Sequence, residues 1–214
     1  MSDRIGEAGA LSRVICVTNR QLVPGENTAE GGEDWAPFLR RITAIAAARP
    51  RAVVLREKDL PPDAYEELAR RVLAICRHAA VPCILHSYAE TARRLGAGGL
   101  HMPLARLRGM PAEQRRAFPV LGTSCHSVED LLEAERLGCS YAFLGHIYAT
   151  ACKPGLPPRG RDLLRHGCGA VHIPVYAIGG ITPVRLQEVL SDGAAGACVM
   201  SGFMHGDAWL TEKE

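Results

Sequence analysis

Two glycine-containing segments near the carboxyl end have the composition of a phosphate site. The first, AIGGIT over Ala177–Thr182, and the second, VMSG over Val199–Gly202, each follow a short apolar run. Glycine lets backbone N–H groups approach a ligand closely, and the start of a following helix adds partial positive charge that suits a phosphate dianion. The same glycines would also suit two tight turns without any ligand. The residues predicted to bind phosphate are Gly179, Gly180, Met200, Ser201 and Gly202.

A pair of basic residues follows another apolar run. In LREKDL, Arg56 and Lys58 are two residues apart, so in an extended segment their side chains point to the same side. Two neighbouring cations can hold a carboxylate or a phosphate, and a lysine partly removed from water can act as a base. Arg56 is therefore predicted to bind substrate, and Lys58 is a catalytic candidate. The alternative is a surface charge cluster neutralised by Glu57 and Asp59.

A histidine lies where a further strand is expected to give way to a helix. His126 stands in GTSCHS, and Ser127 is followed three residues later by Asp130, a pattern typical of a helix cap. Histidine is the side chain best suited to proton transfer near neutral pH, so His126 is predicted to be a general acid or base. A lone histidine is more often a capping or core residue, and that alternative stays open.

Other polar residues fall near the same expected rim. Lys153 is predicted to contact substrate, and His101 and His146 are weaker candidates that could equally satisfy loop carbonyl groups. The sequence contains no C-x-x-C pair and no histidine spacing typical of a metal site, so no metal ligand is predicted. Cys16 and Cys198 fall inside apolar runs, which is typical of small buried thiols.

Eight short apolar runs alternate with amphipathic stretches, of which 62–78, 127–137 and 182–190 have clear helical patterns. Strand then helix, eight times, indicates a single domain over residues 1–214 with the (β/α)₈ TIM-barrel fold. This fold would bring all the candidate residues to one face, where the carboxyl ends of the strands meet. An open doubly wound sheet is the main alternative, but the G-x-G-x-x-G turn is missing after the first run. The predicted strands are Val14–Val17, Ala52–Leu55, Cys83–Leu85, Gly99–His101, Val120–Gly122, Tyr141–Leu144, Val175–Ile178 and Ala197–Met200.

Composition narrows the class of protein. The chain has 214 residues, 47% of them hydrophobic, and a formal net charge of +2. This is enough for one substantial core, and the arginines are scattered, so a nucleic-acid partner is not expected. Because there is no apolar run of about 18 residues and no signal-peptide pattern, the sequence predicts a cytoplasmic protein without a membrane partner.

Several motifs, taken in order, resemble the thiamine phosphate synthase superfamily and, within it, the thiazole tautomerase branch. They are LREKDL, GAGGLHMPLARL, GTSCHSVEDLLEAERLGCSYAFLGHIYATACKPGLPPRG, YAIGGITP and CVMSGF, and they run from about Ile15 to Phe203. The resemblance implies a (β/α)₈ barrel that acts on a small phosphorylated thiazole.

Two departures distinguish the branches. Members of the synthase branch couple a pyrimidine pyrophosphate to a thiazole phosphate. They carry an Asn-Asp pair after strand three and an Asp after the strand-four histidine, which serve magnesium. Here these places read LHS at 85–87 and HMPLAR at 101–106, so those carboxylates are missing. Without a divalent cation, the charge that develops on departing pyrophosphate is poorly neutralised. The segment ATACK at 149–153, with GH at 145–146 ahead of it, also resembles the tautomerase.

The tautomerase resemblance implies an isomerase in thiamine biosynthesis that needs no cofactor. Its substrate, a non-aromatic carboxythiazole phosphate tautomer, becomes aromatic when the ring carbon bearing the carboxylate loses a proton and the exocyclic carbon gains one. The family pattern Ser-x-His-Ser matches 124–127, which assigns proton transfer to His126, with Lys58 second. Two alternatives remain open: a synthase-like transferase, and a non-catalytic regulator that binds thiazole phosphates. Relatives of this fold commonly form dimers, so a homodimer is a possible assembly.

Overall fold

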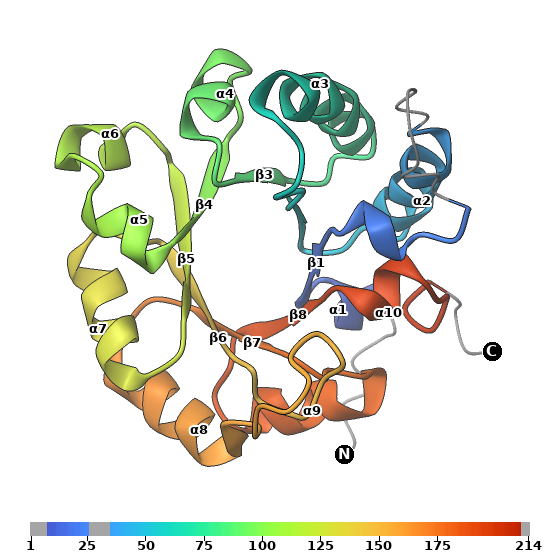
Figure 1. Cartoon of the computed structure of the whole chain (residues 1–214). Coiled ribbons are helices and arrows are strands. Elements are labelled where there is room, and N and C mark those ends of the chain that lie inside the picture. Colours follow the sequence, from blue (N-terminus) through green and yellow to red (C-terminus); the bar gives the residue numbers. More distant parts are fainter. Residues whose placement is uncertain (1–7, 26–34, 211–214) are drawn as a thin grey trace.

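A computed structural model describes residues 8–25 and 35–210, which contain a closed barrel of eight parallel strands. Each strand pairs with the next, and β8 closes the ring on β1 by pairing Ala197 with Val14 and Val199 with Cys16. Helices surround this ring (Figure 1). The predicted (β/α)₈ fold is therefore confirmed. The strands are β1 Val14–Val17, β2 Ala52–Leu55, β3 Cys83–His86, β4 Gly99–Pro103, β5 Val120–Cys125, β6 Tyr141–Gly145, β7 Val175–Ile178 and β8 Gly196–Val199.

Side chains along each strand alternate between two apolar clusters. Ile15 and Phe143 belong to a small cluster inside the barrel, whereas Val14 and Leu144 pack in the larger cluster between the strands and the helices. A strand that is covered on both faces needs apolar residues at successive positions. This explains why the strands read as continuous apolar runs in the sequence.

Helices of different lengths cover the outside. The longest, α3, spans Pro62–His78, as its sequence pattern predicts. Ser127 accepts a hydrogen bond from the backbone N–H of Asp130 at 3.1 Å, which confirms the predicted cap of α7. Within the described ranges, no helix combines the length and the apolar character needed to cross a bilayer. The other helical elements are α1 Ala8–Leu11, η1 Arg20–Leu22, α2 Ala36–Ala47, α4 Ala89–Arg94, α5 Leu104–Arg108, α6 Ala112–Arg116, α7 Val128–Arg136, α8 Gly160–Ala170, α9 Pro183–Ser191 and α10 Ser201–Met204.

Strand boundaries at the site differ from the predicted ones. β4 and β5 continue together because their ladder extends to the pair Pro103 and Ser124, beyond the predicted ends at His101 and Gly122. The eighth strand ends at Val199, one residue early, because Met200 is the residue that precedes α10. These differences move polar residues from expected loops onto the ends of strands.

Removal of the α7 cap is expected to destabilise the barrel modestly. Ser127→Ala leaves the N–H of Asp130 without its side-chain acceptor, and loss of such a cap typically costs about 1 kcal/mol. Urea unfolding should show this decrease, whereas Ser127→Asp, which keeps an acceptor oxygen, should remain close to wild type. Equal stability of the alanine and aspartate variants would contradict the role of the cap.

Candidate active site

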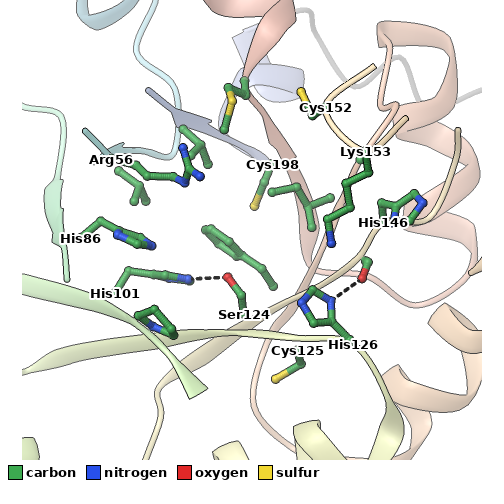
Figure 2. Close-up of a pocket in the computed structure, with 18 of the residues that line it drawn as sticks. Arg56, His86, His101, Ser124, Cys125, His126, His146, Cys152, Lys153 and Cys198 are labelled. Atoms are coloured by element: carbon green, nitrogen blue, oxygen red, sulfur yellow. Dashed lines mark hydrogen bonds between the residues drawn. The ribbon is translucent and has the colours of Figure 1, made fainter. Parts of the chain in front are cut away.

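A cavity of about 550 Å³ opens at the carboxyl ends of the strands (Figure 2). Its walls come from all eight strand ends and from the loops after β2, β5, β6, β7 and β8. Most of the site residues predicted from the sequence are brought together here, although they lie far apart along the chain. Those that line the cavity are Arg56, Lys58, His126, Lys153, Gly179, Gly180, Met200 and Ser201.

Gly202 is a predicted site residue that the cavity does not include. A Cβ atom at this position would lie 2.8 Å from the indole Nε1 of Trp209. Packing against that ring therefore accounts for glycine here. The prediction that Gly202 contacts the ligand is not supported by its position.

Cations gather in the cavity without carboxylate partners among the described residues. Arg56 and Lys58 leave the end of β2, and Lys153 reaches in from the loop after β6 (Figure 2 labels Arg56 and Lys153). Among the described residues, none of these three forms an ion pair. Partial burial lowers the pKa of Lys58, and the positive charges of Arg56, Arg106 and Lys153 lower it further. Such a cluster favours an anionic ligand.

Glu57 explains why its two basic neighbours face the cavity together. Its side chain is 1% exposed and turns toward the loop after β1, where it accepts hydrogen bonds from the Thr18 hydroxyl at 2.5 Å and the Arg20 backbone N–H at 3.0 Å. Asp59 also pairs with Arg20, at 2.7 Å. The two adjacent carboxylates are thus engaged with Thr18 and Arg20, and they do not neutralise Arg56 and Lys58 as the surface-cluster alternative requires.

The loop after β7 has the backbone geometry of an anion cradle. Gly179 and Gly180 have backbone φ angles of 96° and 68°, which residues other than glycine rarely adopt. Within residues 8–25 and 35–210, the backbone N–H groups of these glycines find no acceptor. The guanidinium of Arg185, on α9, donates to the Gly180 carbonyl at 2.6 Å and so fixes the position of the loop. Two free N–H groups at the cavity wall suit a phosphate oxygen.

One ring nitrogen of His126, Nδ1, contacts a backbone carbonyl, and the rest of the ring faces the cavity (Figure 2). Its Nδ1 lies 2.7 Å from the Gly145 carbonyl oxygen, and its backbone N–H donates to Asp130 at 2.8 Å. Because a carbonyl oxygen can only accept, Nδ1 carries the hydrogen. In the neutral ring Nε2 is then the basic atom, and it is available to a ligand.

Two further histidines form the floor beside Arg56 (Figure 2). Burial, together with the positive charges of Arg56 and Lys58, lowers the pKa of His86 to about 3. Burial likewise holds the pKa of His101 well below its usual range. Both rings are therefore neutral near pH 7 and can act as hydrogen-bonding groups, but not as cations.

His101 lies in the middle of a hydrogen-bonded chain. Its Nδ1 is 3.0 Å from the Tyr141 hydroxyl, and its Nε2 is 2.9 Å from the Ser124 hydroxyl. Tyr141 belongs to the cluster inside the barrel, and Ser124 lines the cavity. The chain thus links the barrel interior to the ligand space.

Comparison with known proteins assigns this chain to a family. The family described as thiamine monophosphate synthase matches residues 27–203. The chain belongs to the thiamine monophosphate synthase family. It is 30% identical over 200 residues to thiamine-phosphate synthase 2 of Streptococcus pneumoniae, covering 91% of this chain and 89% of the relative. It is also 30% identical over 208 residues to thiamine-phosphate synthase of Caldanaerobacter subterraneus, covering 94% and 90%.

Solved structures of this family share the fold. Thiamine phosphate pyrophosphorylase from Pyrococcus furiosus superposes with a TM-score of 0.75, over 92% of this chain and 90% of that one. The sequence identity of this pair is 24%, so the likeness is one of architecture. The N-acetylmannosamine-6-phosphate 2-epimerase of Clostridium perfringens has the same architecture, with a TM-score of 0.61 and 15% identity.

In this member of the thiamine monophosphate synthase family, the described part of the cavity lacks the donor set that magnesium requires. Asp130 is the only carboxylate on the described cavity wall, and it already accepts from the His126 backbone and lies 4.0 Å from Arg108. Nowhere in the described residues do three His, Cys, Asp or Glu side chains form a group that could hold a metal ion. Magnesium prefers several oxygen ligands, so the described residues do not fit it.

Sequence reasoning missed several residues of this site. His86, Ser124 and Tyr141 were not predicted, although Ser124 lies two residues from His126 within the motif that carries the family resemblance. A single histidine or tyrosine on a strand gives no spacing signal. The register of β3 and β4 was needed to bring His86 beside His101, with their ring centroids 5.5 Å apart.

Proposed function

We propose that the protein is a thiazole tautomerase, a cofactor-independent isomerase within this family of thiamine biosynthesis. The observation that carries the proposal is the setting of His126, whose Nδ1 is held by the Gly145 carbonyl while Nε2 faces a cavity rich in cations that pair with no described carboxylate. An aromatising proton shift on a doubly anionic substrate needs a positioned base and two anion sites, and nothing more.

The substrate would bind by its two charged ends. The phosphate would accept hydrogen bonds from the free backbone N–H groups of Gly179 and Gly180, with Met200 and Ser201 closing the other side. The ring carboxylate would lie by Arg56, with Lys153 above the ring. Binding both ends fixes the ring carbon near His126, which converts proton transfer into a local step.

The His126 ring would carry the proton between two carbons. Nε2 removes the proton from the ring carbon that bears the carboxylate, and the C–H electron pair enters the ring π system. The imidazolium then returns a proton to the exocyclic carbon on the phosphate-bearing arm, which leaves an aromatic thiazole and a neutral histidine. The Gly145 carbonyl stabilises the imidazolium through Nδ1–H. Lys58, whose pKa is lowered, is the second candidate base.

A transferase is the second candidate function, because the relatives at 30% identity are named thiamine-phosphate synthase. That reaction would require the cavity cations to neutralise departing pyrophosphate without magnesium held by carboxylates of the described wall. The donor set on the described wall favours the isomerase.

The deciding experiment follows aromatisation by ultraviolet absorbance with purified protein, with EDTA or with added magnesium. Turnover of the thiazole tautomer in EDTA supports the proposal. Formation of thiamine phosphate from the pyrimidine pyrophosphate and the thiazole phosphate, only with magnesium, would replace it with the transferase. Binding of the carboxythiazole phosphate product with neither activity would point to a regulator.

Loss of one cavity cation is expected to weaken substrate binding more than turnover. Arg56→Gln removes a charge-assisted contact to the carboxylate, which is typically worth about 1.5–3 kcal/mol, so KM should rise roughly 10- to 150-fold with a smaller change in kcat. Arg40→Gln, an exposed arginine on α2, is the control and should leave KM unchanged. A KM near wild type in Arg56→Gln would remove this residue from the proposed site.

A further inference from the structure

The chain from Tyr141 through His101 to Ser124 has a preferred direction of hydrogen bonding. Tyr141 and His101 are 6% and 1% exposed, so neither can exchange hydrogen bonds freely with water. Within the described ranges, the Tyr141 hydroxyl meets no other partner than His101 Nδ1. The neutral imidazole ring has one N–H and one acceptor nitrogen, so the chain can run in only two ways.

In the first arrangement, the Tyr141 hydroxyl donates to Nδ1, and the Nε2–H of His101 donates to Ser124. Every buried hydrogen then has an acceptor, and the Ser124 hydroxyl hydrogen is free to point into the cavity. In the second arrangement Ser124 donates to Nε2 and Nδ1–H donates to Tyr141. The Tyr141 hydroxyl hydrogen is then buried without an acceptor, which is costly. The first arrangement is therefore favoured.

We propose that Tyr141 is a positioning residue that, through His101, orients the Ser124 hydroxyl as a hydrogen-bond donor to the ligand. The class of ligand group that this donor takes is an anionic or carbonyl oxygen, and not an amine or amide N–H. The identification of that oxygen with the thiazole carboxylate rests on the proposed function.

Charge around the chain agrees with this assignment. The positive charges of Arg56 and Lys58 act on the ring of His101, whose Nε2 lies 2.9 Å from the Ser124 hydroxyl. Burial keeps His101 neutral, which preserves the single N–H on which the direction depends. A carboxylate between Arg56 and Ser124 would then meet donors on two sides.

Two variants separate this role from packing. Tyr141→Phe keeps the ring, which packs against Gly122, and removes only the hydroxyl. The matched control is Tyr176→Phe, because Tyr176 lies inside the same barrel, edge-on to Tyr141 with ring centroids 6.1 Å apart, and its hydroxyl bonds to no described residue.

The first measurement is the tautomer of His101 by ¹⁵N NMR in the unliganded protein. Wild type and Tyr176→Phe should show a protonated Nε2 and an unprotonated Nδ1 that accepts a hydrogen bond, whereas in Tyr141→Phe the Nδ1 resonance should move to the value of a nitrogen that accepts none. A protonated Nδ1 in wild type would overturn the proposal, as would an unchanged Nδ1 resonance in Tyr141→Phe. This readout requires neither ligand nor turnover.

The second measurement is binding of the carboxythiazole phosphate product and of inorganic phosphate by calorimetry. Product affinity should fall about 10- to 100-fold in Ser124→Ala and about 3- to 10-fold in Tyr141→Phe, and the double variant should match Ser124→Ala. Phosphate affinity should not change. Additive losses, or equal losses for product and phosphate, would overturn the proposal. Absence of turnover with these binding effects intact would instead count only against the tautomerase assignment.

Discussion

His126→Asn is expected to lower kcat at least about a hundredfold, because a positioned general acid or base typically contributes about 10²–10⁴-fold to rate. The asparagine amide can still donate to the Gly145 carbonyl in place of Nδ1–H, so the loop after β6 should stay in place. It offers no basic atom where Nε2 stands. Steady-state kinetics on the thiazole tautomer should therefore show a lower kcat with little change in KM.

The control is His166→Asn, an exposed histidine on α8 outside the cavity. This variant should retain wild-type kcat, and both proteins should bind inorganic phosphate equally well. A turnover within about threefold of wild type in His126→Asn would transfer the role of base to Lys58. Lys58→Met is then the variant that should lose activity.

Gly179→Ala is expected to destabilise the protein by about 2–5 kcal/mol, the sum of left-handed backbone strain and overpacking. At a φ of 96° an alanine is strained, and its Cβ would lie 2.3 Å from the Cβ of His146 and 2.8 Å from its Cα. Because both atoms belong to or adjoin the backbone, the loop after β6 would have to move. Urea unfolding should show the loss, and affinity for inorganic phosphate should fall with it.

Gly169→Ala provides the matched control in α8. A Cβ there meets nothing within 4 Å, and its backbone is helical, so alanine should stabilise the protein by about 0.5–1 kcal/mol. If Gly179→Ala were as stable as Gly169→Ala, the loops after β6 and β7 would not pack as closely as Gly179 and His146 do in this structure.

The barrel could be predicted because its signal is local and repeated. Runs such as Val14–Val17 are covered on both faces, so each strand is visible in the sequence without knowledge of its neighbours. The helix cap at Ser127 follows equally from local composition. Strand ends near the site were less accurate, because the β4–β5 ladder depends on register between segments about twenty residues apart.

The candidate site could be predicted where residues come in motifs. Arg56 and Lys58 are linked by strand periodicity, and Gly179 and Gly180 by their position after an apolar run. Gly202 carried the same signal but packs against Trp209, a contact that sequence spacing does not encode. Tyr141 could not be predicted because no motif marks it. Its proposed role depends on a hydrogen bond between its hydroxyl and His101, which lies on another strand.

The buried carboxyl of Glu57 makes the junction of the first two loops sensitive to proton concentration. Burial raises its pKa above the ordinary carboxyl value, and the bonds from Thr18 and the Arg20 backbone, with the Arg20 charge, offset only part of that rise. The folded chain therefore binds this proton more tightly than the unfolded chain does. The resulting stability is complete below the ordinary pKa and is lost as pH rises through the raised value.

Proton linkage at Glu57 thus predicts that the free energy of unfolding declines with pH across that window. Glu57→Gln removes the titrating group, so the pH dependence of its urea midpoint should be flatter than that of wild type, and identical slopes would contradict this linkage. The Thr18 hydroxyl that donates to Glu57 also accepts from the Arg56 backbone N–H at 2.9 Å. The segment that carries Arg56 is therefore thermodynamically coupled to a proton that lies outside the cavity.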